Sequence, residues 1–90
     1  MSIHPRDVPY ALRFVKKAAK EFGKLERLEQ EQLWAALLIL CAEAMGDIKQ
    51  MKGEFKGQYR LAVGDLRIIF IRDEQVLEVR KVGRRKDIYK

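Results

Sequence analysis

The chain has 90 residues, of which 48% are hydrophobic, and a formal net charge of +6. This length and composition predict one globular domain spanning residues 1–90. A metal centre and a disulfide framework are excluded, because Cys41 is the only cysteine and His4 the only histidine. The longest apolar run, residues 33–42, has ten residues, about half of what a membrane-spanning helix needs. We therefore expect a cytoplasmic protein without metal, cofactor or membrane contact.

Positive charge is concentrated in the second half of the chain. Residues 1–47 contain 7 basic and 7 acidic side chains, whereas residues 48–90 contain 12 basic and 6 acidic ones. This asymmetry predicts a region of positive potential that faces an anionic partner, for which RNA or DNA phosphates are common choices. A basic surface that only aids solubility is the alternative at this point.

Apolar residues recur at spacings of three and four in the first part of the chain. Val8, Leu12 and Phe22 belong to this pattern, which predicts a helix over residues 8–22. Asp7 can cap the start of this helix and Gly23 can end it.

The same spacing continues from Leu28 to Met45 and predicts a second, longer helix that ends near Gly46. Because this helix is broadly apolar, we expect it to be well covered, with Trp34 and Cys41 in the core. The short connection between the two helices predicts an antiparallel helical hairpin.

The second half changes to the alternation of β-strands. Residues 58–63 and 66–71 flank Gly64-Asp65, a two-residue loop that predicts a tight β-hairpin. Residues 75–82 predict a third antiparallel strand. The expected core face of the hairpin pairs Val63 with Leu66, Leu61 with Ile68 and Tyr59 with Phe70, with Leu77 and Val79 on the same side.

These elements predict an α+β fold, in which the helical hairpin packs on one face of a twisted, mainly antiparallel sheet of three to four strands. The opposite face is expected to be uncovered and rich in arginine. Arg60 lies diagonal to Arg67 there, at about 7–8 Å, and Arg80 follows on the third strand. Like charges this close repel one another unless an anion bridges them, which favours a phosphate-binding face.

Three blocks of sequence, in this order, resemble the RelE/ParE superfamily of bacterial and archaeal toxins, and most closely its RelE branch. They are the Lys-Gly pair at residues 52–53, the segment 57–70 around Tyr59-Arg60, and the segment 82–89 that ends in Tyr89. The resemblance implies the toxin of a type II toxin–antitoxin system, which cleaves messenger RNA in the ribosomal decoding site. It also implies a cognate antitoxin protein as partner, with messenger RNA and the ribosome as targets.

The resemblance also assigns roles to single residues, in a reaction without metal or cofactor. Arg60 and Arg67 would contact the scissile and flanking phosphates while the ribose 2′-hydroxyl attacks. Arg85 would stabilise the leaving 5′-oxygen or the transition state, and Tyr89 would stack on a base or accept a proton. The implied RNA-binding residues are Lys52, Arg80, Arg84 and Lys86.

Three features depart from the family pattern. An N-terminal strand usually precedes the first helix, but residues 1–6 offer only Ser2-Ile3-His4 before Pro5, so we expect that strand to be very short or absent. Relatives often carry a second basic residue where this chain has Ala62, and a histidine where it has Arg84. Two alternatives therefore stay open beside the ribonuclease. They are a ParE-like inhibitor of DNA gyrase and a catalytically degenerate relative that only binds RNA or an antitoxin.

Overall fold

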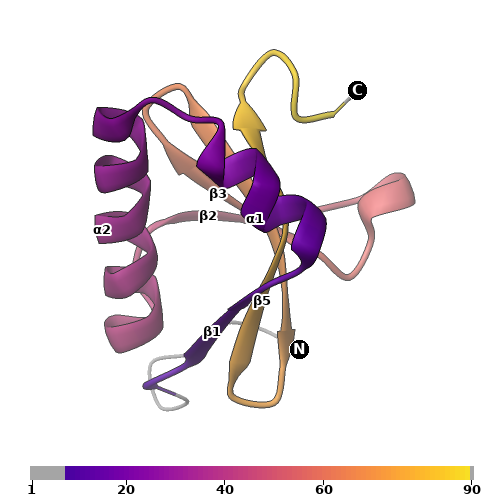
Figure 1. The fold of residues 1–90 in the computed structure, drawn as a ribbon. Helices are drawn as coiled ribbons and strands as arrows, with labels where there is room; N and C mark the ends of the chain where they lie inside the picture. The colour runs from indigo at the N-terminus through magenta and orange to yellow at the C-terminus, as the bar shows by residue number, and fades with distance from the viewer. Residues whose placement is uncertain (1–7, 90) are drawn as a thin grey trace.

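The computed structural model describes residues 8–89, so the expectations for His4 and Asp7 concern residues outside the described range. Within residues 8–89 there are five strands, two α-helices and a short 3₁₀ helix (Figure 1). In chain order they are β1 (Ala11–Phe14), α1 (Lys16–Gly23), α2 (Arg27–Glu43), β2 (Asp47–Gln50), η2 (Gly53–Phe55), β3 (Tyr59–Val63), β4 (Leu66–Asp73) and β5 (Val76–Arg84).

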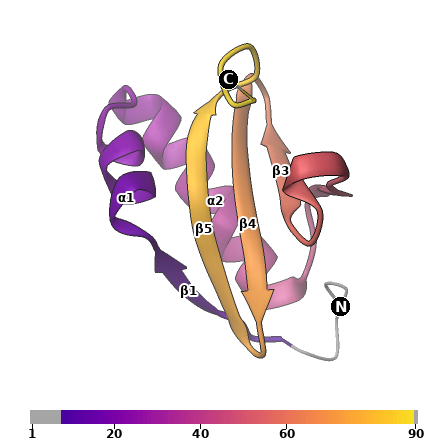
Figure 2. The ribbon, with the colours of Figure 1, turned by 90° about the vertical axis from the view of Figure 1, so that its right-hand side faces the viewer.

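The strands form one sheet in the order β1-β5-β4-β3-β2. The β1–β5 pair is parallel and the other three pairs are antiparallel. Both helices pack on the same face of this sheet, and Figure 2 looks onto the other face, with α2 behind the strands and α1 to the left of β5. The predicted α+β fold is confirmed, with five strands in place of the three to four expected.

The prediction of a helix over residues 8–22 is wrong at its start, because residues 11–14 form strand β1 and α1 begins only at Lys16. Leu12 and Phe14 are half-buried and alternate with exposed residues, as in a strand. Backbone hydrogen bonds tie this strand to β5, because the Val15 amide donates to the Val79 carbonyl at 3.0 Å. The apolar residues here fit both the helical spacing and the alternation of a strand. Hydrogen bonding to the edge of β5 makes this segment a strand.

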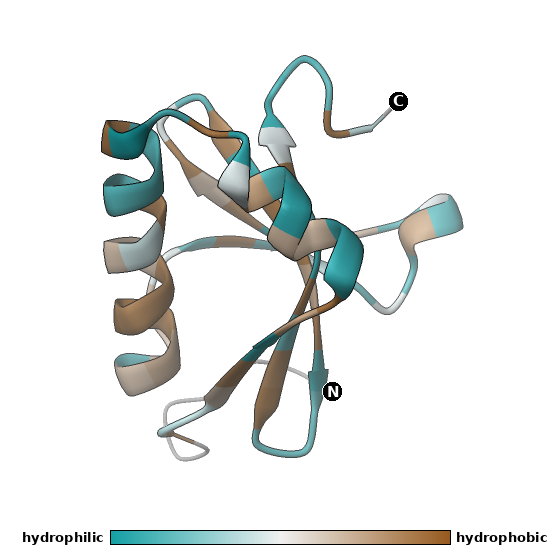
Figure 3. Ribbon diagram, in the orientation of Figure 1, coloured by the Kyte–Doolittle hydropathy of each residue, from teal (hydrophilic) through white to brown (hydrophobic). Residues whose placement is uncertain are grey.

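Helix α2 matches its predicted range closely. A capping box between Glu26 and Glu29 begins it, and Ala44 in the left-handed conformation, with φ 55°, ends it ahead of Gly46. The core position of Cys41 is confirmed, but Trp34 is 44% exposed and does not lie in the core. Trp34 instead stacks on the ring of Phe14 at the surface. The helix is therefore buried on one side only, although Figure 3 shows that its C-terminal half is largely apolar.

The β3–β4 hairpin has the predicted register in every pair that was expected. Gly64 at its turn has φ 57°, which glycine adopts without strain. The side chains that this register turns toward the helices form the core, since Leu61, Ile68 and Phe70 are at most 1% exposed. Figure 3 shows the corresponding apolar stretches on the strands beneath the helices.

The pairing of β4 with β5 contains a bulge that the sequence did not reveal. Phe70 pairs with Val79, whereas its neighbour Ile69 pairs with Lys81, so Arg80 has no counterpart on β4. One extra residue reverses the facing of all residues that follow it. Lys81 therefore lies on the face opposite the helices, and Arg84 lies on the helix side.

Candidate functional site

The sheet face that the helices leave uncovered, here called the open face, is the candidate functional site. Strand alternation and register define its members from all five strands. They are Arg13 from β1, Asp47 and Lys49 from β2, Arg60 and Ala62 from β3, Arg67, Ile69 and Ile71 from β4, and Glu78, Lys81 and Gly83 from β5.

Arg60 lies in the middle of the open face and is largely withdrawn from water. Its side chain is 19% exposed, and its Nη2 donates to Oδ1 of Asp47 at 3.2 Å. Its Nε is buried and has no hydrogen-bond partner among residues 8–89. Lys49 stands opposite Arg60 in the β2–β3 register and adds a second positive charge. The arrangement leaves a buried donor beside an excess of positive charge.

Arg67 is held at the end of the β3–β4 hairpin. Its Nη1 donates to the carbonyl oxygens of Gly64, at 2.7 Å, and Leu66, at 2.9 Å. Ala62 lies directly opposite Arg67, as predicted. Ala62 has no polar side-chain atom, so it offers the Arg67 guanidinium neither an ion pair nor a hydrogen bond.

The C-terminal turn, residues 85–89, folds back to the open face beyond the end of β5 (Figure 2). The Arg85 amide donates to the Asp65 carbonyl at 2.8 Å. Ile88 is 2% exposed and packs over Gly83, where an added Cβ would lie 3.4 Å from its Cδ1. This packing brings the segment that carries Arg85 and Tyr89 to the side of the sheet that holds Arg60.

Tyr89 meets a residue from the loop between β2 and β3. It is 46% exposed, and its ring lies edge-to-face with Phe55, with centroids 6.0 Å apart and an interplanar angle of 70°. Ile69 of β4 faces away from the helices, and it is nevertheless only 1% exposed. The expectation of an uncovered face is therefore wrong at its centre, which this loop and the C-terminal turn cover.

Glu78 is the acidic residue of β5 on the open face, and two arginines neutralise it. Arg13 Nε donates to its Oε2 at 2.8 Å, and Arg80 Nη1 lies 3.2 Å from its Oε1. With both carboxylate oxygens engaged, Glu78 is an ion-pair partner that orients Arg13 and Arg80.

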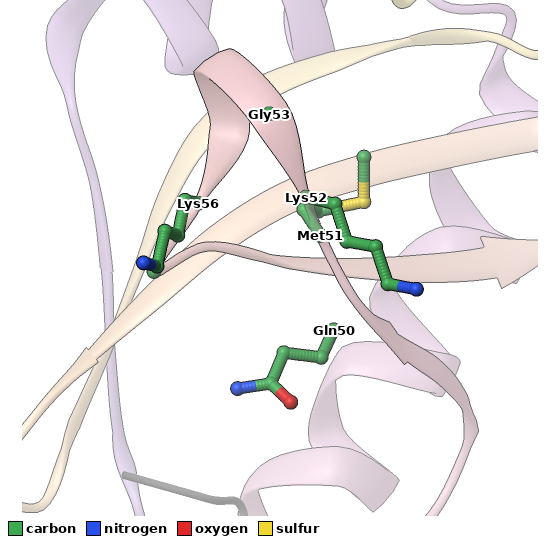
Figure 4. A pocket seen from close by; sticks show the side chains of 6 residues that line it. Gln50, Met51, Lys52, Gly53 and Lys56 are labelled. Carbon is green, nitrogen blue, oxygen red and sulfur yellow. The ribbon is translucent and has the colours of Figure 1, made fainter.

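Three further residues named from the sequence lie away from this cluster or at its margin. Arg84 donates to both carboxylate oxygens of Glu29 on α2, at 2.7 and 3.0 Å, on the helix side of the sheet. Lys86 is exposed on the C-terminal turn. Lys52 lines a cavity of about 400 Å³ within the loop of residues 50–57. The ammonium groups of Lys52 and Lys56 point to opposite sides of that cavity (Figure 4).

Sequence reasoning missed four side chains that the structure adds to this region. Arg13 and Lys49 enter through β1 and β2, two strands that were not predicted at these positions. Lys81 enters through the bulge, and Phe55 through the folding of its loop against Tyr89. The alternation of residues 10–14 was a signal for β1 in the sequence, whereas the bulge leaves no comparable mark.

The described residues provide no sign of a metal site or a membrane span. Within residues 8–89, no three His, Cys, Asp or Glu side chains gather closely enough to hold a metal ion. Neither helix in that range is long and apolar enough to cross a bilayer.

No protein-family model matches the sequence, and no curated protein matches it either. Solved structures do resemble the fold. The RelBE2 toxin–antitoxin complex of Mycobacterium tuberculosis matches with a TM-score of 0.78 and 23% identity, over 89% of this chain and 95% of that one. The archaeal RelE–RelB complex of Pyrococcus horikoshii matches with a TM-score of 0.73 and 21% identity, over 89% and 99% of the two chains.

The isolated RelE toxin of Escherichia coli is also similar, with a TM-score of 0.67 and 25% identity over 83% of each chain. These structures share the two helices on one face of a mixed five-stranded sheet. The resemblance of the sequence blocks and the likeness of the folds point to the same group of proteins. The chain therefore has the fold of the RelE toxins.

Proposed function

We propose that this chain is the toxin of a type II toxin–antitoxin system, and that it is a metal-independent endoribonuclease which cleaves messenger RNA on the ribosome. The observation that carries the proposal is the gathering of Arg60, Arg67 and the turn bearing Arg85 and Tyr89 on the one sheet face that the helices leave open. The RelE fold supports the same assignment.

The proposed reaction is attack of a ribose 2′-oxygen on the adjacent phosphorus, with rupture of the bond from phosphorus to the 5′-oxygen. Arg60 and Arg67 bind the non-bridging phosphate oxygens, because guanidinium groups stay cationic and can donate to two oxygens at once. Arg85 stabilises charge on the leaving 5′-oxygen. Tyr89 stacks on the neighbouring base or takes the proton of the 2′-hydroxyl. The products are a 2′,3′-cyclic phosphate and a 5′-oxygen that takes a proton from water to become the free 5′-hydroxyl.

The environment of Arg60 supports a phosphate ligand. A buried donor without a partner costs about 1–3 kcal/mol, and the Nε of Arg60 is such a donor within the described range. A phosphate oxygen would satisfy this group and would also offset the repulsion between Arg60 and Lys49. Binding of the RNA backbone thus removes a cost that the free protein carries.

We further propose a cognate antitoxin as the partner, in the cytoplasm. Antitoxin complexes of similar folds support this partner. A second support is the outer side of α2, which exposes large apolar side chains to solvent. A cavity of about 320 Å³, lined by Ile39, Met45 and Leu61 among others, lies beside it. Leu28, Leu38, Ile39 and Met45 are the exposed residues of this surface.

The test is induction of the chain in growing cells, followed by genome-wide mapping of transcript 5′-ends. We expect growth arrest with new 5′-hydroxyl ends inside coding regions, which disappear in an Arg60→Ala/Arg67→Ala double variant. Arrest with intact transcripts and altered plasmid supercoiling would replace the proposal with gyrase inhibition. Absence of both effects would leave a binding protein and reject the nuclease.

A further inference from the structure

The bulge in β5 gives Lys81 a place on the open face, where its ammonium group contacts both the C-terminal turn and the loop between β2 and β3. The Nζ donates to the carbonyl oxygen of Ile88 at 2.7 Å. The same Nζ lies 5.8 Å from the ring centroid of Phe55. Phe55 in turn meets the ring of Tyr89 edge-to-face. Lys81 thus contacts the residue that precedes Tyr89 and the ring on which Tyr89 rests.

The C-terminal turn depends on such contacts because no strand ladder continues into it. Its backbone bonds to the sheet region include the one from the Arg85 amide to Asp65, near the start of the turn. The Ile88 amide donates to the carbonyl of Arg84, the last residue of β5, at 3.0 Å. Toward its end, the turn is held by the packing of Ile88 over Gly83 and by the Lys81 bond to Ile88.

We propose that Lys81 and Phe55 are positioning residues for Tyr89. Lys81 fixes the height of the turn above the sheet through the Ile88 carbonyl, and Phe55 fixes the orientation of the phenol ring through the edge-to-face contact. The consequence for catalysis rests on the proposed ribonuclease function, whereas the consequence for Tyr89 itself does not. Neither residue needs to touch the RNA for this role.

The structural arm of the test uses the full chain labelled with 3-fluorotyrosine. The ¹⁹F signals of Tyr10, Tyr59 and Tyr89 are assigned with single Tyr→Phe variants. We expect Phe55→Leu to shift the Tyr89 signal through loss of the ring current, and Lys81→Met to shift or broaden it. Lys81→Arg, which keeps a cationic donor, should retain most of the original signal.

Tyr59 provides the internal control, because it is stacked on Phe70 in the core, on the helix side of the sheet. Its signal must stay in place in every variant, which shows that the fold is intact. A Tyr89 signal that is unchanged in both Phe55→Leu and Lys81→Met would overturn the proposal.

The kinetic arm separates positioning from direct RNA binding. Misplacement of a reacting group by about 1 Å can cost about 100-fold in rate, so Lys81→Met should lower kcat by about 10- to 100-fold with little change in KM. Lys81→Arg should restore most of kcat, and Lys17→Met, at an exposed site on α1, is the matched control. A raised KM with unchanged kcat and an unmoved Tyr89 signal would make Lys81 a phosphate contact and reject positioning.

The two arms fail separately. If the wild-type chain cleaves no RNA, the proposed function is lost, but the ¹⁹F spectra still decide whether Lys81 and Phe55 hold Tyr89. If the wild-type chain cleaves RNA and the spectra of the variants match the wild type, the function stands and the positioning role falls.

Discussion

The two faces of the sheet in this protein have opposite compositions although they are built from the same strands. On the helix side, β3 and β4 contribute Leu61, Ile68 and Phe70, none more than 1% exposed. On the open side the same two strands contribute Arg60 and Arg67, with Ala62 directly opposite Arg67. Alternation along each strand therefore divides the sequence between a face that stabilises the fold and a face that carries charge.

This difference separates stability from function at the level of single residues. Neighbours in sequence, such as Phe70 and Ile69 or Arg60 and Leu61, belong to opposite faces. A substitution on the helix side should mainly lower the free energy of unfolding. A substitution on the open side should be felt mainly in activity, because these side chains contribute little to the main core.

The largest expected effect is on stability, at the centre of the helix-side face. Phe70 is 0% exposed and stacks on Tyr59 with ring centroids 5.5 Å apart. Phe70→Ala should lower the free energy of unfolding by about 3–5 kcal/mol, through lost burial and the cavity left behind. Urea denaturation followed by circular dichroism measures this loss. A loss below about 1 kcal/mol would mean that Phe70 is not a central core residue.

The next effect is on activity, at Arg67. Removal of one transition-state donor typically costs about 10²–10³ in rate, so Arg67→Ala should reduce the cleavage rate of ribosome-bound messenger RNA by about that factor. The melting temperature should stay close to that of the wild type, since the bonds of the Arg67 side chain within residues 8–89 go to two carbonyl oxygens of its own hairpin. Lys17→Ala on α1 is the matched loss of one positive charge. Near-normal cleavage by Arg67→Ala would remove it from the reaction.

Much of this arrangement could be predicted where local chemistry determines it. Gly64-Asp65 fixes a two-residue turn, and that turn fixes the register from Val63–Leu66 to Tyr59–Phe70. This register alone was enough to predict that Arg60 and Arg67 lie on the same face of the sheet. The C-terminal pair Arg85 and Tyr89 came from the resemblance to RelE toxins, because periodicity says nothing about a turn that folds back.

The features that the sequence did not predict are those set by tertiary contacts. Residues 11–14 alternate in burial but also fit a helical stripe, and their pairing with β5 decides the outcome. Strand β2 has the sequence Asp-Ile-Lys-Gln, with only one apolar residue to mark it. The bulge at Arg80 carries no glycine or proline signal, yet it exchanges the faces of Lys81 and Arg84.

A smaller effect on cleavage is expected at Arg84. This prediction tests whether the bulge places Arg84 on the helix side of the sheet. Because Arg84 pairs with Glu29 on the helix side, Arg84→Ala should reduce cleavage by less than about threefold and cost at most about 1 kcal/mol of stability, as a partly exposed ion pair does. Glu29→Gln should have a similar small cost. A loss of cleavage as large as that of Arg67→Ala would place Arg84 among the RNA contacts.

The smallest effect is a pH dependence from the core. Burial raises the pKa of the Cys41 thiol above its ordinary value of 9.0. The folded state therefore keeps the proton that the unfolded chain releases, so this stabilisation is complete below pH 9.0 and is lost as the pH rises above it. We expect the stability advantage of the wild type over Cys41→Ala, measured by urea denaturation under reducing conditions, to shrink between about pH 7.5 and about pH 10. A constant difference would contradict this assignment.

The most direct measurement is a map of where RNA meets the protein. Titration of the ¹⁵N-labelled chain with a 2′-O-methyl RNA oligonucleotide, which lacks the attacking hydroxyl, reports binding without cleavage. The account predicts that amide shift changes centre on Arg60, Arg67 and Tyr89, and that they weaken as salt is raised. Changes that centre on the outer side of α2 around Leu38, with the amides of Arg60 and Arg67 unmoved, would contradict it.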